Sequence, residues 1–365
     1  MKITLKNTPE QVELVKAMAS RNRDVAYEAQ TALAEFIGPV LAEVINNAPA
    51  LSNLFTTLQY NADDNPSIPL DLYFDVSDED YVQVYSQSRA GGLPTSEVLP
   101  TSAELKIATY SLDSAVSFDR RYAAKSRMDV VAKTMTRVAQ EILLKQNTIS
   151  ANVIMKALAE ASTNGLSHVI AAQTADRFTL ADLNALSTRS KRIVTSFVGG
   201  TPDARQGRGM TDIIVSPEIV EELRAIAYNP INTKAAPGAA ANSNVQTANV
   251  IAEEAYRAAG APEFYGINVI ELNEFGNGQK FNTIFDNSYA GTFDGGVNGD
   301  QIVVGIDRSR EALIRPVAVD SENGGEFNLI ADDQYSIRQN KIGYFGGLEE
   351  GRVVLDNRAL VGVTV

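Results

Sequence analysis

The amino-acid sequence predicts an α+β fold, and three of its features carry that prediction. A long hairpin with a polar tip that contains Gly and Pro occupies residues 56–111. No Gly or Pro occurs from 127 to 162, and apolar residues recur there at helical spacing, which predicts one very long helix. An apolar strand followed at once by a capped helix then marks 176–320 as α/β.

Composition limits the classes of protein to which the chain can belong. With 365 residues, of which 44% are apolar and 21% charged, it can bury a large core, and two domains are expected. The absence of cysteine excludes disulfides and a cysteine nucleophile, and it fits a reducing compartment. No stretch of 18 apolar residues occurs, so we expect no membrane partner. A net charge of −13 argues against affinity for nucleic acid over the whole surface.

The first part of the chain, residues 1–55, reads as a helical arm. Thr8, Pro9 and Gln11 form a capping box with a proline at the first helical position. The pattern predicts a helix to about Ala34, an interruption at 38–39 (Gly-Pro) and a second piece that ends at Asn47.

The hairpin, residues 56–111, should have several strand arms around a tip at 89–102. Apolar and polar residues alternate from Leu70 to Val76, which is the period of a strand. Two further strands are predicted at 81–85 and 104–110. A polar tip of this length has no core of its own, so it is expected to contact something outside its own domain.

The long helix belongs to the third part, residues 112–175. A strand over 112–118 precedes it, and Ser126 with Asp129 three residues later resembles a capping box. The helix should run from 127 to 162, about 54 Å, and Asn164-Gly165 should stop it.

The fourth part, residues 176–320, begins its α/β pattern with a strand over 212–215, after which Ser216 caps a helix that has Pro217 at its first position. Strands are also predicted at 264–272 and 301–306. The tail, 321–365, shows no helical periodicity and should form strands over 334–345 and 352–365, with a turn at Gly346-Gly347.

This order of parts resembles the major capsid protein of tailed bacteriophages, the Hong Kong 97-type fold. The matching stretches are RAGGLPTSEVLPTSAELKIATYSLDSAVSFDRR, DIIVSPEIVEELRAI, FYGINVIEL and VVGIDRSREALIRP. The resemblance implies an N-terminal arm (1–55), an extended loop (56–111), a peripheral domain with a spine helix (112–175), an axial domain (176–320) and strands that return to the peripheral domain (321–365). Only about 55 residues precede the extended loop, so the resemblance implies a separate scaffolding protein or none.

The same resemblance implies a function. Identical chains would form hexamers and pentamers and assemble into an icosahedral shell around double-stranded DNA, without sequence specificity. A portal protein, a scaffolding protein and a possible cement protein would be the other partners. The chain would reside in the virion and assemble in the cytoplasm of the host bacterium. An encapsulin-like nanocompartment that encloses a cargo protein is the alternative within this fold.

An α/β enzyme with an unrecognised carboxylate site is the alternative from another class. Neither nucleotide-binding fingerprint occurs, and the one histidine, His168, is expected at a helix end or on the surface. Asp294, Asn298 and Asp300 could hold a cation, but a solvated loop is the more common reading of such a cluster. We therefore assign no catalytic, cofactor-binding or metal-binding residue.

Charge is segregated along the chain in a way that favours contact between copies. Residues 61–80 contain seven acidic residues and no Lys or Arg, whereas the entry to the long helix is basic. A solvated helix face is the alternative for the basic residues. The interface candidates are Asp75, Asp78, Glu79, Asp80, Tyr81, Tyr85, Arg89, Glu97, Arg120, Arg121 and Arg127.

Overall fold

A computed structural model describes residues 8–46, 51–61, 64–69, 104–163, 166–174, 176–193, 209–228, 263–264, 266–289, 301–319, 326–332 and 339–365. The chain divides into two compact units, each built from three separate stretches of sequence. Unit 1 comprises Met1–Ile68, Glu104–Ser150 and Leu313–Val353. Unit 2 comprises Pro69–Ala103, Ala151–Ala312 and Val354–Val365.

Unit 1 begins with two helices, α1 (Pro9–Ala17) and α2 (Arg23–Asn46). The capping prediction for α1 is confirmed, because the Thr8 hydroxyl accepts a hydrogen bond from the Gln11 backbone N–H at 3.4 Å. The predicted interruption at 38–39 is wrong: α2 continues through Pro39, and the chain breaks earlier, between the two helices. There the Asn22 side chain accepts from the Asp24 N–H at 3.2 Å and so begins α2.

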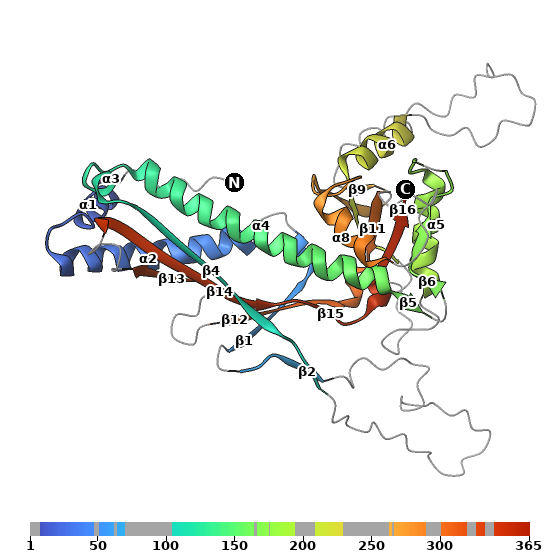
Figure 1. The fold of residues 1–365 in the computed structure, drawn as a ribbon, viewed down its shortest axis with the longest axis horizontal. Helices are drawn as coiled ribbons and strands as arrows, with labels where there is room; N and C mark the ends of the chain where they lie inside the picture. The colour runs from blue at the N-terminus through green and yellow to red at the C-terminus, as the bar shows by residue number, and fades with distance from the viewer. Residues whose placement is uncertain are drawn as a thin grey trace, which may run out of the picture. The chain divides into compact units, whose positions relative to one another are not determined.

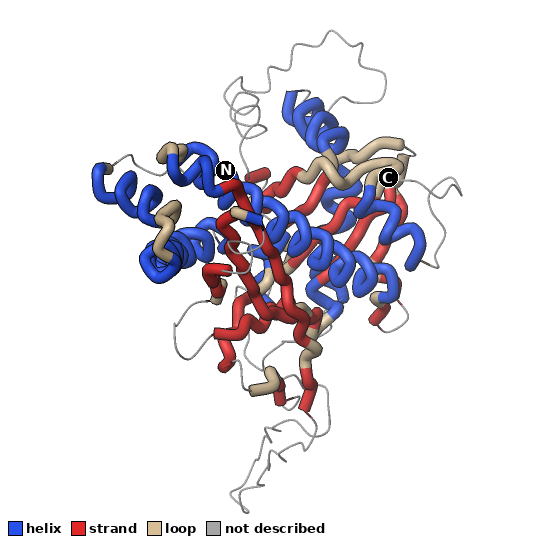
Figure 2. The backbone as a smooth tube through the Cα atoms, turned by 60° about the vertical axis from the view of Figure 1, so that its left-hand side comes forward, coloured by secondary structure: helices blue, strands red, loops and turns tan. Residues whose placement is uncertain are grey.

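The long helix is confirmed as α4 (Met128–Glu160), which follows the short helix α3 (Arg120–Ala124). Its 33 residues give a length of about 50 Å, and Figures 1 and 2 show it without interruption. The capping box predicted at Ser126 is wrong. Ser126 has a φ of 52°, and its buried hydroxyl has no hydrogen-bond partner among the described residues. The predicted stop, Asn164-Gly165, lies outside the described residues.

The sheet of unit 1 is built around β14 (Lys341–Gly351), which pairs antiparallel with β4 (Thr109–Asp119) along its whole length (Figure 1). On the other side of β14 lie β13 (Asn328–Asp332) and β12 (Leu313–Val319), and β12 pairs in parallel with β1 (Thr56–Asn61). The short strand β15 (Val353–Val354) also pairs with β12.

The predicted turn at Gly346-Gly347 is wrong, because β14 runs straight through both residues. Gly346 is required by packing and not by a turn: a Cβ there would lie 2.4 Å from Cζ of Phe327.

Two short strands, β2 (Ser67–Pro69) and β3 (Glu104–Lys106), form a separate two-stranded ribbon. They hold together the two ends of the segment 70–103, which carries the predicted hairpin tip and lies outside the described residues. The strand predicted over 104–110 is confirmed by β3 and the start of β4.

The core of unit 1 lies between its helices and its sheet. Apolar residues of α2, α4, β4 and β14 form one buried cluster. Its largest members include Leu33, Leu41, Met135, Phe118 and Tyr344, and the rings of Phe118 and Tyr344 stack with centroids 6.3 Å apart. The burial of Leu33 and Leu41 on either side of Pro39 explains why α2 tolerates an internal proline.

Unit 2 is centred on a six-stranded mixed sheet in the order β7-β16-β11-β8-β10-β9. The bounds of its strands are β7 (Val169–Ala171), β8 (Asp212–Val215), β9 (Glu263–Phe264), β10 (Ile267–Glu271), β11 (Ile302–Ile306) and β16 (Leu360–Thr364). The predicted strands at 212–215 and 301–306 are therefore confirmed. A single strand over 264–272 is wrong, since the backbone turns at Gly266, whose φ is +74°, and β9 pairs antiparallel with β10.

Helices cover both faces of this sheet. Side chains of α5 (Leu180–Ile193) and α6 (Pro217–Tyr228) share a core with Ile213, Val215 and Val363. On the other face, Asn282 of α8 (Lys280–Ser288) accepts a hydrogen bond from the Ile302 N–H at 2.9 Å. The predicted cap of α6 is confirmed, because the Ser216 hydroxyl accepts from the Ile219 N–H at 3.3 Å.

The tail is divided between the two units. β13 and β14 belong to unit 1, whereas β16 lies in the middle of the sheet of unit 2, between β7 and β11. The last strand of the predicted segment 321–365 therefore belongs to a different unit from β13 and β14. The 3-10 helix η5 (Asn357–Ala359) interrupts the single strand predicted over 352–365.

Candidate assembly surfaces

The basic residues predicted at the entry to the long helix have different surroundings. Arg120 is half-buried, and its guanidinium donates two hydrogen bonds to the Ala19 carbonyl, at 3.1 and 3.3 Å, so it ties α3 to α1 within unit 1. The Arg121 side chain is 81% exposed and forms an ion pair with Asp119 at 2.8 Å. Hydrogen bonds from Arg121 hold the pKa of Asp119 below its usual value. Arg127 is exposed.

Arg121 and Arg127 thus remain candidates for contact with another molecule, whereas Arg120 has a structural role. The other predicted candidates, Asp75, Asp78, Glu79, Asp80, Tyr81, Tyr85, Arg89 and Glu97, lie outside the described residues.

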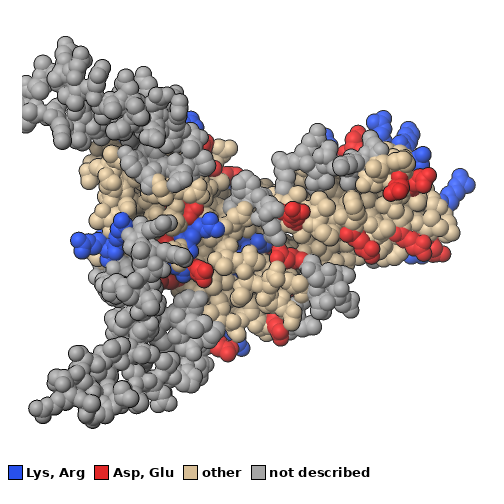
Figure 3. Space-filling model, turned by 180° about the vertical axis from the view of Figure 1, so that it is seen from behind, with Lys and Arg blue, Asp and Glu red and all other residues tan. Residues whose placement is uncertain are grey.

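Two further surfaces of unit 1 have the chemistry of interfaces. The solvent face of α2 carries exposed Glu28, Glu35 and Glu43 beside exposed Phe36 and Val40. The solvent face of α4 carries charges of both signs, with Leu144 on the same face; its exposed charged residues are Asp129, Lys133, Arg137 and Glu141. Figure 3 shows acidic and basic side chains close to one another over the helices of unit 1, which lie at the right of that view.

Unit 1 also contains a buried ionic cluster that sequence reasoning missed. Glu350 accepts from Arg315 at 2.7 Å and from Arg352 at 2.9 Å, and the three side chains are at most 4% exposed. Gln146 and Tyr110 donate to the same carboxylate, at 3.0 and 2.9 Å. Burial by itself would raise the pKa of Glu350, but the two guanidinium groups outweigh that effect and hold it below its usual value.

The Arg352 guanidinium has further partners within unit 1. It donates to the hydroxyls of Ser52 and Ser150, and it lies over the ring of Phe55, 5.4 Å from its centroid. The cluster therefore joins β14 to β12, α4 and the 3-10 helix η1 (Leu51–Leu54). No local pattern in the sequence marks these residues, which are far apart along the chain.

A pocket of about 510 Å³ lies next to this cluster. It is lined by Ser52, Asn53, Phe55, Thr57, Leu58, Gln59, Arg315 and Glu326. Its walls contain serine and threonine hydroxyls, but the one histidine of the chain belongs to unit 2. A Ser–His nucleophile therefore cannot be built in this pocket from unit 1.

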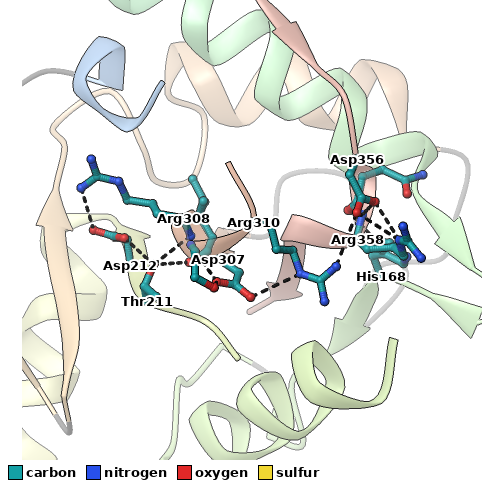
Figure 4. Close-up of polar contacts among 11 residues, drawn as sticks. His168, Thr211, Asp212, Asp307, Arg308, Arg310, Asp356 and Arg358 are labelled. Atoms are coloured by element: carbon teal, nitrogen blue, oxygen red, sulfur yellow. Dashed lines mark hydrogen bonds and ion pairs between the residues drawn. The ribbon is translucent and has the colours of Figure 1, made fainter. Parts of the chain in front are cut away.

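A polar network of unit 2 follows the loops at one end of its sheet (Figure 4). Arg310 lies between two carboxylates, at 3.3 Å from Asp307 and 3.4 Å from Asp356. Asp356 in turn pairs with Arg358 at 2.9 Å. These bonds link the 3-10 helix η4 (Arg308–Arg310), which follows β11, to η5, which precedes β16.

The network ends at His168, which is buried and not at the surface, contrary to the sequence-based expectation. Its Nδ1 lies 3.0 Å from the carbonyl oxygens of both Asn357 and Leu360. Two acceptors require that Nδ1 carries a proton. Burial lowers the pKa of His168, so the ring is neutral at neutral pH. The imidazole holds η5 and the start of β16 in place, and the contacts of the network are those of a structural anchor.

Two further features of the described residues bear on other functions. No group of three or more His, Asp or Glu side chains there is arranged to hold a metal ion. Among the helices of the same residues, none combines the length and the apolar character that crossing a bilayer would require.

Comparison with known proteins shows similarity only at the level of structure. No family model and no curated protein matches the sequence. The capsid of a native GTA particle is similar over 87% of this chain and 89% of that chain, with a TM-score of 0.50 and 11% identity. A structure from Microbacterium phage Oxtober96 is similar over 86% of this chain and 90% of its own, with a TM-score of 0.49 and 12% identity.

A third similar structure is the holo-SrpI encapsulin from Synechococcus elongatus PCC 7942, with a TM-score of 0.44, 11% identity and coverage of 87% and 88% of the two chains. At such identities the likeness concerns the fold alone. The GTA capsid matches across most of both chains. This chain therefore has the fold of tailed-phage major capsid proteins, the Hong Kong 97-type fold.

Proposed function

We propose that the protein is a major capsid protein that tiles a closed icosahedral shell around double-stranded DNA. One observation carries the proposal: within a capsid-type fold, β2 and β3 close the base of a segment, 70–103, that is rich in polar residues and has a Gly- and Pro-containing tip. A loop of this kind is suited to lie on a neighbouring subunit, because a polar tip buries little within its own chain.

In this proposal the function is assembly and not catalysis. Hexamers and pentamers form through unit 2, and the loop and the α1–α2 arm connect neighbouring copies. Each subunit makes many weak contacts at the same time. Together they hold the shell closed, although no single contact is strong. A net charge of −13 would keep packaged DNA from adhering to the shell.

The partners follow from the same proposal. A scaffolding protein would set the size of the shell, a portal protein would occupy one vertex, and a cement protein could reinforce the mature particle. Assembly would take place in the cytoplasm of the host bacterium, and the protein would end in the virion.

Expression of the full chain, alone and with the scaffolding protein of its genomic neighbourhood, tests the proposal. Negative-stain electron microscopy should show closed shells or capsomers, and light scattering should give masses far above the 39.3 kDa of one chain. A monomer under all salt and scaffold conditions would overturn it. Native particles filled with a protein cargo and free of DNA would instead identify an encapsulin-like compartment.

A further inference from the structure

Two turns follow one another between β10 and α8, and each has an exposed asparagine as its second residue. The first turn spans 272–275 and contains Asn273, and the second spans 276–279 and contains Asn277. In each turn the N–H of the last residue donates to the carbonyl of the first, at 3.2 Å and 3.1 Å respectively. The two asparagines thus occupy equivalent positions and differ in the residue that follows them.

Glycine follows the asparagine of the second turn and leaves the backbone there open. Gly278 has a φ of +70°, which is typical of the third residue of a type II turn and which glycine adopts without strain. A Cβ on Gly278 would meet nothing within 4 Å. Within the described part of the chain, neither the Gly278 N–H nor the Asn277 side chain makes a hydrogen bond. Both groups are therefore open to reaction with each other and with water.

From this arrangement we infer that Asn277 is a site of spontaneous deamidation. Asparagine is among the chemically labile residues of proteins. The Gly278 nitrogen attacks the side-chain carbonyl carbon of Asn277, and an N–Cγ bond forms. The Cγ–Nδ2 bond breaks, and ammonia leaves with the proton that the Gly278 nitrogen gives up. Water then opens the cyclic imide at either carbonyl, which gives aspartate or an isoaspartyl residue that continues the backbone through its side-chain carboxyl group.

Neighbouring asparagines lack this combination of features. Asn273 is exposed in an equivalent turn, but the side chain of Glu274 crowds the backbone nitrogen that would have to attack. Asn268 lies on β10, and its Nδ2 donates a hydrogen bond to Asp212 at 2.9 Å, which holds the carboxamide in place. Of these three asparagines, we therefore expect Asn277 to react first.

The modification acts on the start of α8. Gln279 is the residue before this helix and makes no side-chain cap, so the backbone turn positions the first residues of the helix. The rings on either side of the turn, Phe275 and Phe281, are buried and meet edge to face with centroids 5.8 Å apart. An isoaspartyl residue lengthens the backbone of the turn and so disturbs the hydrogen bond that closes it. Ageing should therefore loosen α8 and lower the stability of unit 2.

Peptide mapping tests the site directly. One tryptic peptide, residues 258–280, contains all three asparagines, so a single measurement compares them. The purified full-length protein is kept in mildly alkaline buffer below its melting temperature, and samples are digested at intervals for mass spectrometry with fragmentation. Asn277 should convert several times faster than Asn273 or Asn268. Its rate should rise with pH, because the Gly278 nitrogen must lose a proton. Freshly purified protein, digested in the same way, corrects for conversion during digestion.

Exchange of the following residue supplies matched variants. Glu274→Gly gives the first turn the same pair of residues as the second and should make Asn273 convert at a rate close to that of Asn277. Asn277→Gln should remove the conversion at this position, because its longer side chain closes a ring much less readily. Circular dichroism verifies that both variants are folded. The inference is wrong if Asn277 converts no faster than Asn273 in the wild type, or if folded Glu274→Gly leaves Asn273 unchanged.

Thermal unfolding tests the consequence for α8. Aged wild type should melt at a lower temperature than fresh wild type, and Asn277→Gln should lose less on ageing under the same conditions. Asn277→Asp, which has the new charge on a backbone of ordinary length, should melt above the aged wild type. Equal losses for the wild type and Asn277→Gln would overturn the link to α8. None of these measurements depends on assembly, so their outcome leaves the proposed function to its own test.

Discussion

Arg352 and Glu350 form an ion pair at the end of β14. Glu350 lies on the strand, Arg352 is the first residue after it, and the Arg352 Nη2 atom is 2.9 Å from the Glu350 carboxylate. Both side chains are fully buried. Arg315 binds the same carboxylate, so two buried guanidinium groups share Glu350 as a partner.

Replacing Glu350 by Gln should therefore destabilise unit 1 strongly. Arg352 and Arg315 would both lose a buried ion-pair partner, and breaking a buried ion pair costs about 3–5 kcal/mol of unfolding free energy. Urea unfolding of the unassembled protein measures the loss. Glu349→Gln is the matched control, because Glu349 is only partly buried and accepts its hydrogen bonds from Tyr60 and Thr109. Equal losses for the two variants would contradict the role given to the cluster.

His168 should make unit 2 sensitive to acid. Burial lowers its folded-state pKa, so below the unfolded value of about 6.5 the unfolded chain binds a proton that the folded chain does not. The contribution of His168 to the free energy of unfolding is fully present above the unfolded-state pKa. It should fall as the pH decreases towards the folded-state pKa, by at most about 1.4 kcal/mol per pH unit. The charged groups near the ring are Arg189, which lowers the pKa further, and Asp356, which raises it.

Urea unfolding midpoints at about pH 8 and pH 5.5 measure this dependence. His168→Gln keeps a donor for the carbonyls of Asn357 and Leu360 but cannot titrate. Because the chain has no other histidine, this variant should lose most of the pH dependence in that window. If the unfolding midpoints of the wild type and the variant shift equally with pH, His168 does not control the pH dependence of stability.

Gly346→Ala should destabilise the sheet of unit 1 by about 1–3 kcal/mol. The new methyl group would meet the buried ring of Phe327 at 2.4 Å, and that ring has little room to move in a packed core. Gly347→Ala is the control, since its methyl group would meet the carboxylate of the exposed Asp113 at 3.1 Å and would be in ordinary contact with Phe345 at 3.7 Å. In thermal unfolding, the melting temperature of Gly346→Ala should be well below that of Gly347→Ala. The reverse order would refute this account of β14.

Replacing residues 89–102 with a short Gly-Ser turn should leave the subunit folded and abolish shells. The ribbon of β2 and β3 closes the segment at its base, so the core of unit 1 does not depend on the tip. Circular dichroism and electron microscopy of the same preparation would separate folding from assembly. Normal shells, or a variant that unfolds, would show that the loop has been assigned the wrong role.

Local signals in the sequence were sufficient wherever one short stretch decides its own structure. The capping box at Thr8, the strand over 212–215 and the cap and proline that start α6 were predicted correctly. The long helix was predicted because its apolar residues recur with helical period and no Gly or Pro interrupts them. The Hong Kong 97-type fold could be inferred from the order of such elements.

Where a local signal competed with packing, packing decided the structure. Pro39 and the glycines at 346 and 347 are breaking signals by themselves, yet α2 and β14 continue through them. Burial of Leu33 and Leu41 outweighs the hydrogen bond that Pro39 removes, and the ring of Phe327 occupies the space that Gly346 leaves.

Only the tertiary structure determined which distant segments meet. The parallel pairing of β1 with β12, the position of β16 inside the sheet of unit 2 and the burial of His168 join residues more than a hundred positions apart. The ionic cluster around Glu350 likewise combines residues that share no local pattern. A sequence pattern reports the period and the ends of an element, whereas the partner of each face is set by the packing of the whole chain.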